Sequence, residues 1–193
     1  MTRLALSLRA AALAIVLAVP VAAFQAVPAD PFDGIPNVEF VYYDVTGTSA
    51  KEIRESMNAK GLVDPNDGNR VDAIARWRFA WQWPRTLDGT CDLSRAEVRF
   101  NAVVTLPRLV SDEKLDRPTR TKWQRYMKSL REHEAGHIRP PYDDRNQLLD
   151  AIKGSDCAGA SAAAHAVIAR FGARDREYDA KTQHGAKQGA RFP

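Results

Sequence analysis

Between residues 73 and 106 the chain twice alternates apolar and polar side chains, and after Pro107 a helical repeat replaces that alternation. Successive side chains of a strand point to opposite faces, so a period of two predicts strands from Ala73 to Trp83 and from Val98 to Leu106. We expect the two strands to pair antiparallel and the second to stop at Pro107. Tryptophans 77, 81 and 83 share one face, which favours a buried sheet face over an aromatic substrate platform.

Helices are expected on either side of these strands. A strand from Val38 to Val45 precedes a capping box of Ser49 and Glu52, and Gly61 stands at a helix C-cap position. Beyond Pro107 the helical repeat has Pro118 in a first turn and apolar residues at Trp123, Met127 and Leu130. Two more helices should run over 142–153 and from 156 to 171 or beyond. These patterns predict an α+β fold, a small antiparallel sheet followed by a helical half.

The N-terminus is typical of an export signal. Arg3 and Arg9 precede an apolar run that ends in small residues, which predicts a signal peptide over 1–23. A proline-rich leader over 24–37 and one domain over 38–193 follow. We expect a periplasmic or extracellular protein without membrane insertion after cleavage. Of the net charge of +4, two charges lie in the signal peptide, and the remaining basic residues form no stripe that would predict nucleic-acid binding.

The two cysteines, Cys91 and Cys157, would be exported into an oxidising compartment. We therefore predict one disulfide that closes a loop of about 66 residues and ties the β-rich half to the helical half. The alternative, two thiolate metal ligands, lacks a paired CxxC spacing.

Chemistry is indicated by His133-Glu134-Ala135-Gly136-His137. Histidines four residues apart share a helix face, so His133 and His137 could bind one Zn²⁺, with Glu134 as the general base and not a ligand. A third protein ligand would leave the fourth position for water. Of the two other histidines, we favour His184 over His165, because it lies in a polar segment rich in groups that could ligate.

The chain resembles a bacterial family of predicted secreted zinc-dependent proteases, catalogued as a domain of unknown function, from about residue 42 to 189. The similarity lies in the order of short motifs: Tyr43-Asp-Val-Thr-Gly, Arg76-Trp77, Cys91, Val104-Thr-Leu-Pro107, Trp123, the HExxH motif, Cys157 and Tyr178-Asp179-x-x-Thr182-x-His184-Gly185. The resemblance implies a zinc peptidase with one Zn²⁺ per chain, a peptide or protein as substrate and His184 as third ligand. Asp179 is then the runner-up ligand or a hydrogen-bond acceptor for a ligating imidazole. Tyr178 would stabilise the oxyanion or pack in the core.

Three expectations stay open at this level. Pro140 cannot donate a backbone hydrogen bond to Gly136, so the HExxH helix should end or kink near Ile138 or Arg139. Substrate should lie along a strand edge, for which the Arg99-bearing strand is a candidate. A non-catalytic binding module with a structural zinc site, and a zinc amidase acting on cell-wall amides, are the alternatives to a peptidase.

Overall fold

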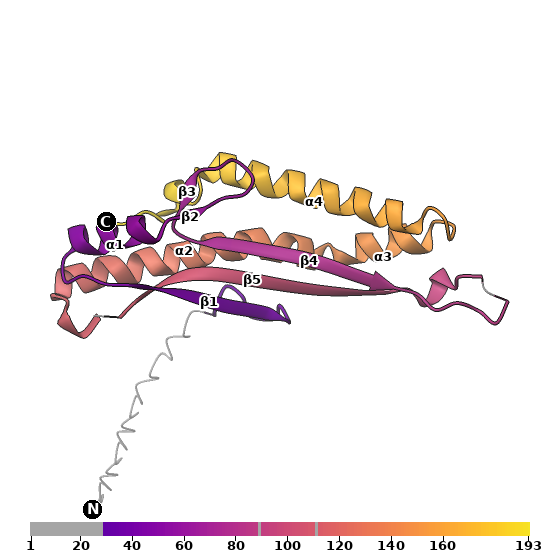
Figure 1. Cartoon of the computed structure of the whole chain (residues 1–193), viewed down its shortest axis with the longest axis horizontal. Helices are drawn as coiled ribbons and strands as arrows, with labels where there is room; N and C mark the ends of the chain where they lie inside the picture. The colour runs from indigo at the N-terminus through magenta and orange to yellow at the C-terminus, as the bar shows by residue number, and fades with distance from the viewer. Residues whose placement is uncertain (1–28, 89, 111) are drawn as a thin grey trace, which may run out of the picture.

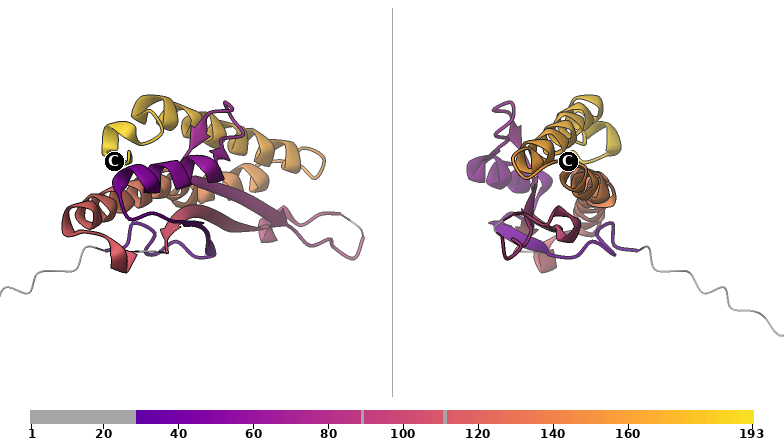
Figure 2. Two further views of the ribbon diagram at one scale, coloured as in Figure 1. Left: turned by 60° about the vertical axis from the view of Figure 1, so that its left-hand side comes forward. Right: turned by 90° about the vertical axis from the view of Figure 1, so that its right-hand side faces the viewer.

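A computed structural model describes residues 29–88, 90–110 and 112–193. The predicted signal peptide and residues 24–28 of the leader lie outside this part of the chain. The α+β fold class is confirmed: a three-stranded sheet and a two-stranded hairpin precede three helices in the C-terminal half. In Figure 1 the long strands and helices α2 and α4 extend along the same axis, and Figure 2 shows the helices stacked on one side of the sheet.

The main sheet has the order β1-β5-β4, formed by Val38–Val45, Glu97–Leu109 and Ile74–Gln82. β4 and β5 pair antiparallel, as predicted. β1 instead lies parallel to β5, so the sheet is mixed. Trp77 is opposite Ala102 and Phe79 is opposite Phe100, which places these side chains on the face that packs against the helices.

The prediction that β5 stops at Pro107 is wrong. The strand continues to Leu109, with Tyr43 of β1 opposite Pro107. β4 reaches only as far as Thr105, so beyond that point β5 has a neighbour on one side only among the described residues. A proline is tolerated there because no second strand requires its missing N–H group.

The short helix α1 spans Ala50–Lys60 and has the predicted caps. Ser49 accepts a hydrogen bond from Glu52 N, and Gly61 takes the left-handed conformation that ends the helix. The Glu52 carboxylate bonds Thr48 N at 2.7 Å, so the reciprocal half of the capping box is displaced by one residue. After α1, strands β2 (Leu62–Val63) and β3 (Arg70–Val71) form the small hairpin.

Helix α2 spans Arg117–Asp143 and carries the HExxH motif. The expected end near Ile138 is wrong, because the helix continues through Pro140 and Pro141. Only two residues of the helix follow Pro141, and this end is held by burial of Ile138 and Pro141 and by the hydrogen bond from Asp144 N to the Pro140 carbonyl. Packing therefore outweighs the two lost backbone hydrogen bonds.

Helices α3 and α4 span Arg145–Lys153 and Ala160–Thr182. α3 begins three residues later than predicted, and α4 begins later and runs eleven residues beyond Phe171. A 3-10 turn, η3 (Ala186–Gln188), follows α4, and two further 3-10 turns, η1 (Leu93–Arg95) and η2 (Asp112–Lys114), flank β5. Length matters here, because the added turns of α4 bring its C-terminal end beside the HExxH motif.

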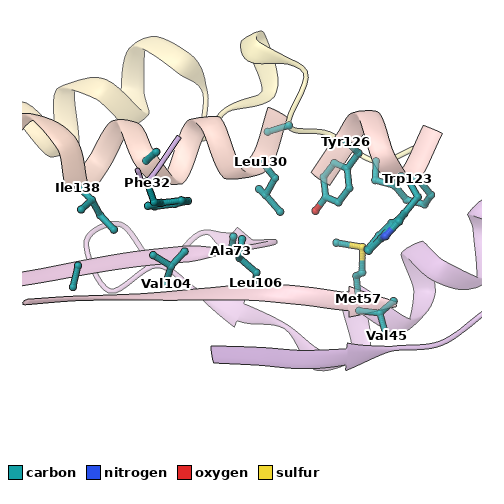
Figure 3. Packing of buried hydrophobic residues seen from close by; sticks show 14 of the residues in the cluster. Phe32, Val45, Met57, Ala73, Val104, Leu106, Trp123, Tyr126, Leu130 and Ile138 are labelled. Atoms are coloured by element: carbon teal, nitrogen blue, oxygen red, sulfur yellow. The ribbon is translucent and has the colours of Figure 1, made fainter. Parts of the chain in front are cut away.

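Two hydrophobic clusters hold these layers together. The larger lies between the sheet, α1 and α2, where Leu106, Trp123, Leu130 and Ile138 are buried (Figure 3). Phe32 of the leader also packs there at 6% exposure, so the packed part of the chain begins before Val38. The smaller cluster joins α3, α4 and the tryptophan face of β4, with these residues fully buried: Leu148, Ile152, Ala160 and Ala164.

The predicted disulfide between Cys91 and Cys157 is present, with Cα atoms 5.8 Å apart. It links the β4–β5 connection to the segment before α4, as expected for a bond between the two halves. None of the helices in the described ranges combines the length and apolar composition that a membrane span requires.

Candidate metal centre

The HExxH residues lie on the buried side of α2, where this helix contacts β4 and α4. His133, Glu134 and His137 are exposed by only 3%, 3% and 7%. Such groups are rarely buried unless they pair with other polar groups or bind a metal. Their burial identifies this region as the candidate metal-binding or catalytic site.

Asp179 of α4 completes a triangle of ligand atoms with the two histidines. Its Oδ1 lies 3.3 Å from His133 Nε2 and 3.1 Å from His137 Nε2, and the two nitrogens are 3.2 Å apart. Zinc bonds to nitrogen and oxygen of about 2.0–2.1 Å in a tetrahedron give ligand atoms about 3.3 Å apart. The three residues can therefore hold a metal ion without moving apart or together by more than a few tenths of an ångström.

One carboxylate oxygen of Asp179 is buried without a hydrogen-bond partner in the described part of the chain. Its Oδ1 is buried and has no hydrogen bond of acceptable geometry among the residues that the structure describes. Burial would raise the pKa of the Asp179 carboxyl, but the neighbouring imidazoles of His133 and His137 outweigh it and lower that pKa. A buried, ionised carboxylate oxygen without a hydrogen bond is what a metal ligand is expected to show when no metal is bound.

Each histidine is oriented by a partner on its other ring nitrogen. His137 Nδ1 donates to Asp175 Oδ1 at 2.7 Å, and His133 Nδ1 donates to Gln188 Oε1 at 2.9 Å. These bonds turn both Nε2 atoms toward Asp179, which is the tautomer and orientation that metal ligation needs. The two supports differ in charge, since one is a carboxylate and the other a neutral amide.

Tyr178 packs against the histidines from the side of Gly136. Its ring stacks on His133 at 5.1 Å between centroids, and its hydroxyl accepts a hydrogen bond from Gln188 Nε2 at 3.0 Å. A Cβ at position 136 would collide with the tyrosine ring, so glycine is required at this point of the motif. Tyr178 is not among the residues that line the cavity described below, and its ring supports His133; its role as an oxyanion donor stays a prediction.

The metal-free protein holds protons in this site. Burial raises the pKa of Glu134 to about 8, although His137 and the backbone of Ala75 act in the opposite direction. For His137, burial alone would lower the pKa, but the hydrogen bond to Asp175 and the nearby Asp179 carboxylate outweigh it and raise the pKa to about 10. A bound metal must therefore displace a proton from His137.

His184 lies beside this triangle but in a different group. Its Nε2 donates to Asp67 Oδ2 at 3.0 Å, and its Nδ1 is 3.5 Å from Asp179 Oδ1. His184 forms a second grouping of side chains that could hold a metal ion, together with Asp64 and Asp67 at the tip of the β2–β3 hairpin. The structure thus groups Asp179, the runner-up, with the histidine pair, and His184 ties the hairpin to the site. His165 lies elsewhere, exposed against Trp81.

A cavity of about 1020 Å³ opens over the triangle. Its walls come from β4, α2, α4, the β2–β3 hairpin and the C-terminal segment, and Glu134, His133, His137, Asp179 and His184 all line it. Ala73 and the first residues of β4, from Ile74 to Trp77, form one wall. The candidate centre is therefore open to a molecule larger than water.

Asp175 and Gln188 were not identified from the sequence. A usable signal existed for Asp175, because Asp175 and Asp179 are four residues apart on a predicted helix, the same spacing as the two histidines. Gln188 carried no such signal, since it lies in a short turn that folds back on α2.

A family described as bacterial protein of unknown function (DUF922) matches residues 40–185, which include the HExxH motif and Asp179. No curated protein and no solved structure matches this chain.

Proposed function

Because the chain belongs to a bacterial family of unknown function, its activity must be argued from the site, and we propose that it is a zinc-dependent hydrolase acting on peptides. The observation that supports this most is the buried Glu134 carboxyl beside the His133, His137 and Asp179 triangle, inside an open cavity. A structural site would need neither the carboxyl nor the opening.

Zinc is the metal that the donor set favours. Two imidazole nitrogens and one carboxylate oxygen suit Zn²⁺, whereas Ca²⁺ and Mg²⁺ prefer oxygen donors alone. Asp175 and Gln188 act as the outer partners that fix the two imidazoles. When bound, Zn²⁺ would lower the pKa of a water molecule and polarise the substrate carbonyl.

Glu134 is the general base in this mechanism. It takes a proton from the attacking water and delivers it to the leaving amine as the carbon–nitrogen bond breaks. Burial of the carboxyl, which raises its pKa, makes it a stronger base than a surface glutamate. Tyr178 holds His133 in place, and His184, whose Nδ1 lies 3.5 Å from Asp179 Oδ1, is the alternative ligand or a hydrogen-bond donor to the substrate.

Substrate would lie along β4 rather than β5. β5, which carries Arg99, is the central strand, whereas β4 is an edge of the sheet and its residues 74–77 line the cavity. An extended peptide can add to such an edge through backbone hydrogen bonds. The proposal includes export of the protein, which the disulfide supports because such bonds persist in oxidising compartments.

The test is metal content and peptidase activity of four proteins: wild type, Glu134→Gln, Asp179→Ala and His184→Ala. We expect one Zn²⁺ per chain in wild type, an inactive Glu134→Gln that keeps its metal, and loss of metal only in Asp179→Ala. If His184→Ala loses the metal and Asp179→Ala keeps it, His184 is the third ligand.

Two other functions are separated by the same proteins. If both Asp179 and His184 are needed for metal and Glu134→Gln changes nothing, the site is closed and structural, and the binding-module alternative replaces the hydrolase. Cleavage of cell-wall amides without cleavage of protein would favour the amidase.

A further inference from the structure

The motif from Tyr178 to Gly185 builds a turn that the metal triangle itself does not require. Thr182 Oγ1 donates to the Tyr178 carbonyl at 2.8 Å and accepts from Gly185 N at 3.3 Å. Gln183 and His184, which follow α4, have φ angles of 52° and 49°. Two successive residues other than glycine are uncommon in this left-handed region, so the surrounding contacts must hold the turn. One of these contacts joins His184 to the β2–β3 hairpin.

The β2–β3 hairpin meets the turn at its tip. Asp67 Oδ1 accepts a hydrogen bond from Asn69 N at 2.8 Å, and Asp67 Oδ2 accepts one from His184 Nε2 at 3.0 Å. Figure 1 shows the hairpin beside the C-terminal end of α4. Each strand of the hairpin has only two residues, so strand pairing alone gives it little stability. The contact with His184 therefore helps to set where the hairpin lies.

The same hydrogen bond decides which nitrogen of His184 faces the metal triangle. An ionised carboxylate only accepts hydrogen bonds, so the proton of this bond belongs to Nε2. The other ring nitrogen, Nδ1, lies 3.5 Å from Asp179 Oδ1. Asp64 does not hold the ring in this way, because its Oδ2 is 3.9 Å from Nδ1, too far for a hydrogen bond. His184 thus presents Nδ1 to the candidate metal centre.

The two histidines of the HExxH motif have the opposite arrangement. His133 and His137 bond their outer partners through Nδ1 and present Nε2 to the centre. In all three rings a partner on one nitrogen fixes the proton and the orientation of the other nitrogen. Asp67 therefore has the same relation to His184 that Asp175 has to His137.

We propose that Asp67 is a positioning residue, which holds the Nε2–H group of His184 so that Nδ1 faces the metal and the substrate bound there. The bond also fixes the hairpin, whose Pro65 and Asn66 line the cavity, so the imidazole and one wall of the cavity are set together. This inference rests on the proposed hydrolase function, which gives Nδ1 a role as ligand or hydrogen-bond donor.

NMR identifies the protonated ring nitrogen without turnover. The chain has four histidines, so long-range proton–nitrogen correlation spectra of the zinc-loaded protein contain few ring signals to assign. We expect a proton on Nε2 of His184, and a proton on Nδ1 of His133 and His137. In Asp67→Ala the His184 ring should populate both tautomers. An unprotonated Nε2 of His184 in wild type would overturn the inference.

Asn69→Ala is the matched control. It removes the hydrogen bond from Asn69 Nδ2 to Asp67 Oδ2 at 2.7 Å, which also stabilises the hairpin tip, and it leaves the Asp67 carboxylate beside His184. The proton should stay on Nε2 of His184 in this variant. If Asn69→Ala and Asp67→Ala change the His184 ring equally, the fold of the tip sets the ring rather than the Asp67 carboxylate, and the inference fails.

Zinc affinity and peptidase activity then show whether the position of His184 matters. We expect Asp67→Ala to lose about tenfold in zinc affinity or in kcat/KM, and Asn69→Ala to stay within about twofold of wild type. A loss of zinc affinity would assign His184 as a ligand, and a loss in kcat/KM alone would assign it as a donor to the substrate. An Asp67→Ala protein that matches wild type in both quantities refutes the positioning role.

Failure of this inference is distinguishable from failure of the peptidase proposal. If wild type cleaves no peptide but has the expected ring protons and loses zinc affinity in Asp67→Ala, only the peptidase proposal fails. If wild type cleaves peptides and Nε2 of His184 is unprotonated, only the role of Asp67 fails.

Discussion

Zinc binding should depend steeply on pH, because the metal-free protein holds a proton on His137. The hydrogen bond to Asp175 and the nearby Asp179 carboxylate outweigh the effect of burial and raise the pKa of His137 to about 10. Metal must displace this proton at any lower pH, so the apparent affinity should rise about tenfold per pH unit between about 6.5 and 9. At pH 7 the proton reduces the affinity about a thousandfold, or about 4 kcal/mol, relative to the deprotonated site.

Zinc affinity rises with pH because metal binding and proton release are linked. The folded protein without metal binds the proton more tightly than free histidine does, so metal release and proton uptake are coupled. Titration calorimetry at pH 7 in buffers of different ionisation enthalpy should count at least one proton released per Zn²⁺. A second would indicate that Glu134, whose pKa is raised to about 8, ionises as metal binds.

Asp175→Asn is the informative variant. It removes the larger of the two hydrogen-bonded supports for the His137 proton, so proton release at pH 7 should fall and the pH dependence should flatten. Its affinity at pH 9, where proton competition is weak, should still be about 10- to 100-fold below wild type, because the ligand is less well oriented. A zinc affinity that is flat from pH 6.5 to 9 in wild type would refute the reasoning.

Two further perturbations follow from the packing. Replacing Cys91 and Cys157 by serine should lower the free energy of unfolding by about 4 kcal/mol in the chain-entropy account of a 66-residue loop, measured by urea denaturation; an unchanged midpoint would contradict it. Gly136→Ala should weaken zinc binding about tenfold, because the new Cβ displaces Tyr178 from its stack on His133. Adding Tyr178→Ala should recover part of that loss, and Gly172→Ala, where a Cβ meets nothing closer than 3.6 Å, should show none.

Local signals predicted most of the fold. Ser49 and Gly61 act within a few residues of their own position, and both caps of α1 are where the sequence indicated. Two of the errors are at prolines. Pro107 is accepted in β5 because β4 is too short to reach it, and Pro140 is accepted in α2 because the surrounding side chains are buried. Both reasons depend on neighbours that are distant in the sequence.

In the site too, the residues on one helix could be predicted, and those contributed by a distant segment could not. His133 and His137 could be paired from the sequence because one helix holds both. The third member of the triangle and the supports come from α4 and the segment after it, and only the docking of α4 on α2 shows that Asp179 lies closer to the pair than His184 does. Residue type alone favoured a third histidine, and geometry favours the aspartate.

The arrangement also separates what stabilises the fold from what builds the site. Asp175 and Asp179 have the same spacing on α4 as the histidines on α2, so two adjacent helix turns bring one carboxylate to His137 and another between the rings. These turns are near the C-terminal end of α4, whereas Cys157 lies before its first residue, Ala160. A helix rises about 1.5 Å per residue, so the disulfide is about 30 Å of helix away from Asp179. Loss of the disulfide should therefore lower the free energy of unfolding while the zinc affinity of the folded protein stays within about threefold of wild type. A parallel loss of both would mean that the disulfide sets the position of α4 along its whole length.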